Sequence, residues 1–128
     1  MPESLEQMLL RHEGFRAHVY KCPAGYDTIG VGRNIEKDSG PGITQEEAMY
    51  LLSNDIKRVR ALLNRHPVYT GLDEVRRMAL ENMCFQLGYN GLLDFKLMWL
   101  ALGRGDWEEA AKEALDSKWA RQDSPGRA

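Results

Sequence analysis

The sequence changes from a helical to a strand-like pattern just after Gly14, so the fold must contain both kinds of element. Ser4 and Gln7 form the capping-box signature of a helix over residues 4–13. Gly14 can end that helix, because a residue without Cβ enters the left-handed region easily. Strand-forming residues on both sides of a Pro-Ala-Gly turn then predict a hairpin or small sheet over residues 17–34.

The rest of the chain has helical spacing. Thr44 and Glu47 form a second capping box, and the apolar residues that follow keep one helical face until Arg65. Shorter apolar series predict further helices over residues 72–87, 92–102 and from 106 toward 119. We therefore expect an α+β fold, with a small β-hairpin lobe and a helical lobe joined by a long helix.

Length and composition favour one domain over residues 1–128, made of two lobes. The hairpin lobe should span about residues 14–43. The helical lobe should span about residues 66–128 and include helix 4–13.

Bulk charge and the N-terminal sequence exclude several classes of protein. The formal net charge is −2, which gives no global attraction to nucleic acid, and no stretch has the length of a membrane span. The first ten residues, MPESLEQMLL, lack the basic and apolar regions of a signal peptide, so we expect synthesis in the cytoplasm. Neither Cys22 nor Cys84 has metal-ligand spacing, and we expect no metal and no cofactor.

Three side chains with useful chemistry fall where the first helix gives way to the hairpin. They have the spacing E-x8-C-x5-T: Glu13, Cys22 and Thr28. A carboxyl group at a helix C-terminus meets the negative end of the helix dipole, which favours keeping its proton. A thiol with a pKa of about 8.5 is mostly neutral at pH 7, but it can accept a hydrogen bond from water. Alternatively, Cys22 packs in the interior, as we expect for Cys84, and Thr28 serves only as a strand former.

The order of motifs resembles the phage-type lysozymes of glycoside hydrolase family 24, and within it the T-even branch. The likeness rests on the E-x8-C-x5-T hairpin with TIGVG, on VRRMALENMCFQLGYNG, and on the final PGRA, and it covers nearly the whole chain. It implies a lysozyme-like fold and cleavage of the β-1,4 bond between N-acetylmuramic acid and N-acetylglucosamine in peptidoglycan.

The resemblance also implies a role for individual residues. Glu13 matches the catalytic acid, Cys22 a position that is Asp or Cys in the family, and Thr28 the residue that holds water. Arg127 matches an arginine that pairs with the catalytic glutamate. Substrate contacts are expected from the cleft-wall pair and from a turn glycine: Phe85, Gln86 and Gly32.

One departure from the family concerns a histidine that usually follows the hairpin GxG. This position is Arg33, and the usual acidic partner on the long helix matches Asp55, so we expect an Arg33–Asp55 ion pair. Direct attack of water should invert the anomeric carbon, whereas attack by a Cys22 thiolate would retain its configuration.

We thus interpret the chain as an endolysin-type lysozyme that would act on the bacterial cell wall. Access to the wall would need a holin or another lysis partner. The alternative is a peptidoglycan-binding module that has lost catalysis, since Cys22 replaces a carboxylate.

Overall fold

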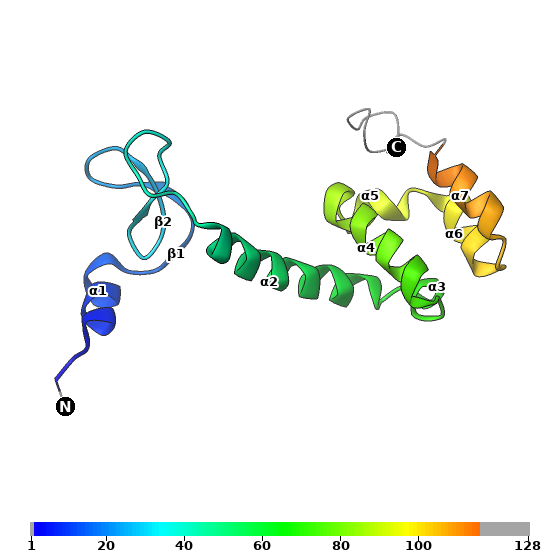
Figure 1. Ribbon diagram of the computed structural model, residues 1–128, viewed down its shortest axis with the longest axis horizontal. Helices are drawn as coiled ribbons and strands as arrows, with labels where there is room; N and C mark the ends of the chain where they lie inside the picture. The colour runs from blue at the N-terminus through cyan, green and yellow to red at the C-terminus, as the bar shows by residue number, and fades with distance from the viewer. Residues whose placement is uncertain (1, 116–128) are drawn as a thin grey trace. The chain divides into compact units, whose positions relative to one another are not determined.

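The computed structural model describes residues 2–115, and the chain divides into two compact units. The first unit ends at Tyr50 and the second begins at Leu51. The helix α2, Gln45–Leu63, contributes residues to both (Figure 1). The mixed helical and strand content confirms the predicted α+β class.

The first unit holds one helix and a small sheet. Helix α1, Leu5–Glu13, precedes strands β1, Arg16–Lys21, β2, Asp27–Gly30, and β3, Arg33–Asn34. The sheet is antiparallel in the order β1-β2-β3, so the hairpin that the sequence predicts carries a third, short strand.

The register of the sheet is set near its β1–β2 turn. Tyr20 pairs with Thr28, and Lys21 with Asp27. Thr28 also pairs with Asn34 on β3, which makes it a residue of the central strand. It is the only buried residue within positions 2–50.

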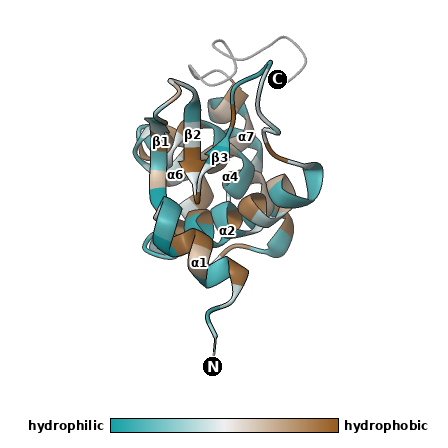
Figure 2. Ribbon diagram, turned by 90° about the vertical axis from the view of Figure 1, so that its left-hand side faces the viewer, coloured by the Kyte–Doolittle hydropathy of each residue, from teal (hydrophilic) through white to brown (hydrophobic). Residues whose placement is uncertain are grey.

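Caps define the first helix as the sequence predicts. The Ser4 hydroxyl accepts from the Gln7 N–H at 3.1 Å, and the Gln7 side chain accepts from the Ser4 N–H at 2.9 Å. No residue of α1 is buried, and Leu5 and Leu9 are exposed on it; Figure 2 shows hydrophobic stretches along this helix. The assignment of helix 4–13 to the helical lobe stays a prediction.

The second unit is helical. After α2 come α3, Pro67–Thr70; α4, Glu74–Leu87; α5, Tyr89–Leu93; α6, Lys96–Gly103; and α7, Trp107–Leu115. Its core is built from twelve buried residues: Leu63, Tyr69, Leu72, Leu80, Met83, Cys84, Leu92, Met98, Trp99, Ala101, Leu102 and Ala110. Cys84 therefore has the packing role predicted for it.

The helices differ from the sequence-based prediction in two regions. The predicted helix over residues 92–102 is broken between α5 and α6, where the Leu92 carbonyl accepts from the Trp99 indole N–H at 3.0 Å and from the Phe95 N–H at 3.2 Å. The sequence pattern predicts no helix where the structure has the short α3. Pro67 occupies the first position of α3, where its missing N–H costs nothing.

None of the helices within residues 2–115 combines the length and the apolar character that a membrane span requires.

Candidate functional site

The Glu13 carboxyl group lies against the turn between β2 and β3. Glu13 is the last residue of α1, and Gly14 ends the helix with φ +71 and an N–H donated to the Leu10 carbonyl. Gly32, in the turn, has φ +68, and a Cβ built on it would lie 2.9 Å from Glu13 Oε2. The absence of a side chain at Gly32 therefore leaves the space that the exposed Glu13 carboxyl occupies.

Cys22 begins the turn between β1 and β2. Its carbonyl accepts from the Gly25 N–H at 2.8 Å, and its own N–H donates to the Tyr26 carbonyl at 3.0 Å. Pro23 suits the second position of this turn, because its ring fixes φ near the required value. These bonds hold the Cys22 backbone close to the start of β2, with the side chain half-buried.

The Thr28 side chain also binds the Tyr26 carbonyl group. Its hydroxyl donates to the Tyr26 carbonyl oxygen at 2.8 Å, so that oxygen accepts from both Cys22 and Thr28. A threonine hydroxyl has one proton, and while that proton is used in this way the oxygen can only accept from a water molecule. The arrangement can therefore orient a water through the lone pairs of Thr28.

The surroundings of Cys22 favour its thiolate. Hydrogen bonding by the Tyr26 backbone is the main cause that lowers the pKa of the Cys22 thiol. Burial acts in the opposite direction, while the backbone of the turn and the Thr28 hydroxyl lower the pKa further. Since Thr28 has a single proton, the Tyr26 carbonyl and the thiolate compete for it. The Cys22 side chain can thus act as a hydrogen-bond acceptor or as a base more readily than an ordinary thiol.

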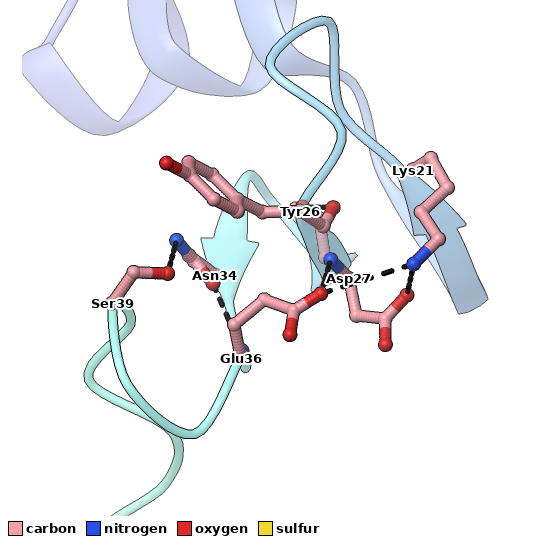
Figure 3. A network of polar contacts seen from close by, with 7 residues as sticks. Lys21, Tyr26, Asp27, Asn34, Glu36 and Ser39 are labelled. Carbon is pink, nitrogen blue, oxygen red and sulfur yellow. Dashed lines mark hydrogen bonds and ion pairs between the residues drawn. The ribbon is translucent and has the colours of Figure 1, made fainter.

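A polar network borders this turn (Figure 3). Lys21 Nζ lies 2.6 Å from Asp27 Oδ1 and 3.8 Å from Glu36 Oε1. The bond to Asp27 is the main cause that raises the pKa of Lys21. Glu36 Oε1 also accepts from the Asp27 N–H at 2.7 Å.

The predicted ion pair between Arg33 and Asp55 is wrong. Arg33 Nη2 lies 2.6 Å from Glu47 Oε2, and Arg33 Nη1 donates to the Gly42 carbonyl at 3.1 Å. Asp55 instead accepts from Arg58 on its own helix at 2.5 Å. The physical reason is proximity along the chain: Gly42 lies in the loop between β3 and α2, and Glu47 lies in the first turn of α2.

Glu47 has two partners, which the sequence showed only in part. Its carboxylate accepts from the Thr44 N–H at 2.8 Å, and the Thr44 hydroxyl accepts from the Glu47 N–H at 3.0 Å, as the predicted capping box requires. Hydrogen bonding with the Thr44 backbone is the main cause that lowers the pKa of Glu47, with the Arg33 charge acting in the same direction. Glu47 therefore joins β3 to the first turn of α2.

Phe85 and Gln86 lie on α4 in the second unit. Phe85 is about half exposed, at 49%, and lines a groove of about 300 Å³ between α2 and α4. The groove is mostly apolar, with three polar side chains, Arg60, Glu81 and Asn82. Gln86 donates to the Asn82 side chain at 2.8 Å. Arg127 lies outside the described residues.

The structure thus brings together two pairs of predicted site residues, Glu13 with Gly32 and Cys22 with Thr28. The sequence did not indicate Tyr26 and Glu36. Tyr26 contributes its backbone groups, for which a sequence carries no signal. The Glu36 contact depends on how the loop after β3 returns to β2. Within residues 2–115, no three His, Cys, Asp or Glu side chains are grouped closely enough to hold a metal ion.

Comparison with known proteins places the chain in a family. Residues 10–127 match the family model described as phage lysozyme. The probable T4-type lysozyme 1 of Dictyostelium discoideum is 32% identical, over 99% of this chain and 90% of its own length. The endolysin of Acyrthosiphon pisum secondary endosymbiont phage 1 is also 32% identical, over 94% of this chain and 80% of its own.

A longer relative contains a similar stretch. The pre-baseplate central spike protein Gp5 of Enterobacteria phage T4 is 37% identical over 98% of this chain, which spans 26% of the length of that protein. The family model and these three relatives each cover more than nine-tenths of the chain. The chain therefore belongs to the phage lysozyme family.

Proposed function

We propose that this chain is an endolysin-type lysozyme, which hydrolyses the β-1,4 bond between N-acetylmuramic acid and N-acetylglucosamine in peptidoglycan. Family membership supports the reaction class. The observation that carries the proposal for this chain is the shared Tyr26 carbonyl, because it holds Cys22 and Thr28 together on the face of the turn where a water could be oriented.

Glu13 acts in this proposal as the general acid. Its proton passes to the glycosidic oxygen as the bond to the anomeric carbon breaks. The position of Glu13 at the end of α1, against the turn between β2 and β3, supports this role. Gly32 supports it by leaving room for the carboxyl group.

Cys22 and Thr28 act on the attacking water. The water donates one hydrogen bond to the Thr28 oxygen, and its other proton passes to the Cys22 sulfur as its oxygen bonds to the anomeric carbon. The lowered pKa of Cys22 supports this role, since a thiolate is the better acceptor. Attack by water inverts the anomeric carbon, and the reaction needs neither a metal ion nor a cofactor.

Substrate contacts are proposed for Phe85, Gln86 and Gly32. An exposed aromatic ring beside an amide offers stacking for a sugar face and a hydrogen bond for an N-acetyl group. Arg127 would pair with Glu13. We further propose synthesis in the cytoplasm of a bacterial host, and passage to the wall with the help of a holin or another lysis partner.

Turbidity of a suspension of purified cell walls tests the proposal. The wild-type chain should clear the suspension, and Glu13→Gln should be slower by about 10²–10⁴-fold, the usual contribution of a general acid. Glu6→Gln is the matched control, because it removes an exposed carboxylate from the same helix. Near-normal clearing by Glu13→Gln would contradict the assignment. A wild-type chain that pellets with the walls without clearing them would favour the binding module.

A further inference from the structure

Every polar atom of the peptide group between Tyr26 and Asp27 is bound by a residue of the site region. Its carbonyl oxygen accepts from the Cys22 N–H at 3.0 Å and from the Thr28 hydroxyl at 2.8 Å. Its N–H donates to Glu36 Oε1 at 2.7 Å. Both residues proposed to handle water thus attach to one end of this peptide group, and Glu36 holds the other end.

Glu36 is itself fixed by the loop that follows β3. Its N–H donates to Asn34 Oδ1 at 2.9 Å, and its carbonyl accepts from the Gly40 N–H at 3.0 Å. Asn34 also bonds the Ser39 hydroxyl at 3.3 Å (Figure 3). Gly40 lies so close to the Asn34 backbone that a Cβ would overlap it. The loop therefore presents the Glu36 carboxylate to Asp27 with little freedom.

The bond from Asp27 to Glu36 is the kind that orients a peptide group strongly. An ionised acceptor makes a shorter and stronger hydrogen bond with a backbone N–H than a neutral one does. It also polarises the peptide, so the carbonyl at the far end becomes a better acceptor. The direction of the Tyr26 carbonyl, and with it the direction of the Thr28 proton, then depends on Glu36.

We propose that Glu36 is a positioning residue for the hydrolytic water, acting through the Tyr26–Asp27 peptide group on Cys22 and Thr28. This inference rests on the proposed function. It assigns no contact between Glu36 and substrate. Without an acceptor oxygen at position 36 the peptide group is free to tilt. The Thr28 hydroxyl then loses its fixed acceptor, and Cys22 loses a fixed backbone position.

If Glu36 acted only through its charge, replacing it would shift the pKa of Cys22 in a different direction from that expected for a positioning role. The charged groups paired with one another here are Lys21, Asp27 and Glu36, with Lys21 bound chiefly to Asp27. Removing the negative charge of Glu36 would, by charge alone, make the Cys22 thiolate easier to form. Loss of the ordered turn would make it harder to form, because the main cause of its lowered pKa is hydrogen bonding by the Tyr26 backbone, whose donor is the Tyr26 N–H on the adjoining peptide group of the same turn. The two roles therefore shift the Cys22 pKa in opposite directions.

Two variants separate geometry from charge. Glu36→Ala removes the acceptor for the Asp27 N–H, whereas Glu36→Gln keeps a carbonyl oxygen there and removes only the charge. Asp38→Ala is the matched control, because it removes an exposed carboxylate from the same loop. Thermal unfolding of each variant would establish that the fold is retained.

The first measurement is the kinetics of glycan hydrolysis. We expect Glu36→Ala to lower kcat about 10- to 100-fold with KM within about twofold, since misplacing a reacting group by about 1 Å costs up to 10² in rate. Glu36→Gln should recover most of this loss, and Asp38→Ala should match the wild type. A Glu36→Ala variant as active as Asp38→Ala, or a Gln variant as impaired as the Ala variant, would overturn the inference.

The second measurement does not depend on activity. The rate of Cys22 alkylation by iodoacetamide is followed against pH, with mass spectrometry to distinguish Cys22 from the buried Cys84. Glu36→Ala should raise the apparent pKa of Cys22, and Glu36→Gln should not. A pKa that falls or stays constant in Glu36→Ala overturns the positioning role. If the wild-type chain hydrolyses no glycan, the proposed function fails, while this result still shows whether Glu36 positions Cys22.

Discussion

Replacing Gly32 by alanine would place a methyl group where the Glu13 carboxyl lies. The added Cβ would be 2.9 Å from Glu13 Oε2, closer than a Cβ approaches another atom, and 3.1 Å from Glu13 Cδ, which is a tight contact. The carboxyl is the free end of a flexible side chain and can move aside. The clash should therefore displace the proposed acid while costing little stability.

The loss of stability should come from the backbone. Gly32 has φ +68, and a residue with a Cβ pays about 1–2 kcal/mol in the left-handed region. For a domain of this size that lowers Tm by about 4–8 °C. Gly30 is the matched control, because it has φ +71 and no atom within 4 Å of its added Cβ. Both alanine variants should lose similar stability.

Activity should separate the two variants. We expect Gly32→Ala to clear cell walls about 10²-fold more slowly than Gly30→Ala, since a displacement of about 1 Å in a reacting group costs this much. Thermal unfolding and turbidity measured on the same preparations give both quantities. Equal activity in the two variants would show that the Glu13 carboxyl need not lie against Gly32, and the reasoning would fail.

Three further predictions concern single side chains. Iodoacetamide should inhibit lysis in proportion to Cys22 labelling, while Cys22→Asp should stay active and Cys22→Ala should lose most activity. Full activity in both the Ala variant and the labelled protein would leave Cys22 a packing residue. Glu47→Gln should lower Tm at pH 7, because Thr44 and Arg33 both bind that carboxylate. The difference in Tm should vanish in acid: the pKa of Glu47 is lowered in the folded chain, so the stability that it contributes above about pH 4.5 is lost as the pH falls through its folded-state pKa. Burial lowers the pKa of His66 from 6.5, so the unfolded chain binds the proton first and the urea midpoint of unfolding should fall as the pH drops below about 6.5. His66→Phe should flatten this pH dependence, and an unchanged slope would refute the assignment to His66.

Local signals in the sequence predicted the elements that depend on local bonds. The capping boxes at Ser4 and Thr44 form as expected, because each uses partners three residues apart. The break between α5 and α6 could not be predicted in this way. It depends on the Trp99 indole, seven residues away from the Leu92 carbonyl that it binds.

The site was predictable to the extent that side-chain identity determines it. The spacing of Cys22 and Thr28 indicated a shared position, and the strand register brings both to Tyr26. The ion pair between Arg33 and Glu47 and the hydrogen bond between Asp27 and Glu36 both depend on the path of the loop after β3. Sequence spacing carries no information about that path, so the predicted partner Asp55 was wrong.

Analysis of the products from purified peptidoglycan tests the central claim most directly. Wild-type digests, examined by mass spectrometry and by NMR of the newly formed ends, should contain N-acetylmuramic acid at every new reducing end. These ends should form first as the inverted anomer, and Glu13→Gln should release almost none. New ends at N-acetylglucosamine, release of peptides without reducing sugar, or equal release by Glu13→Gln would contradict the account.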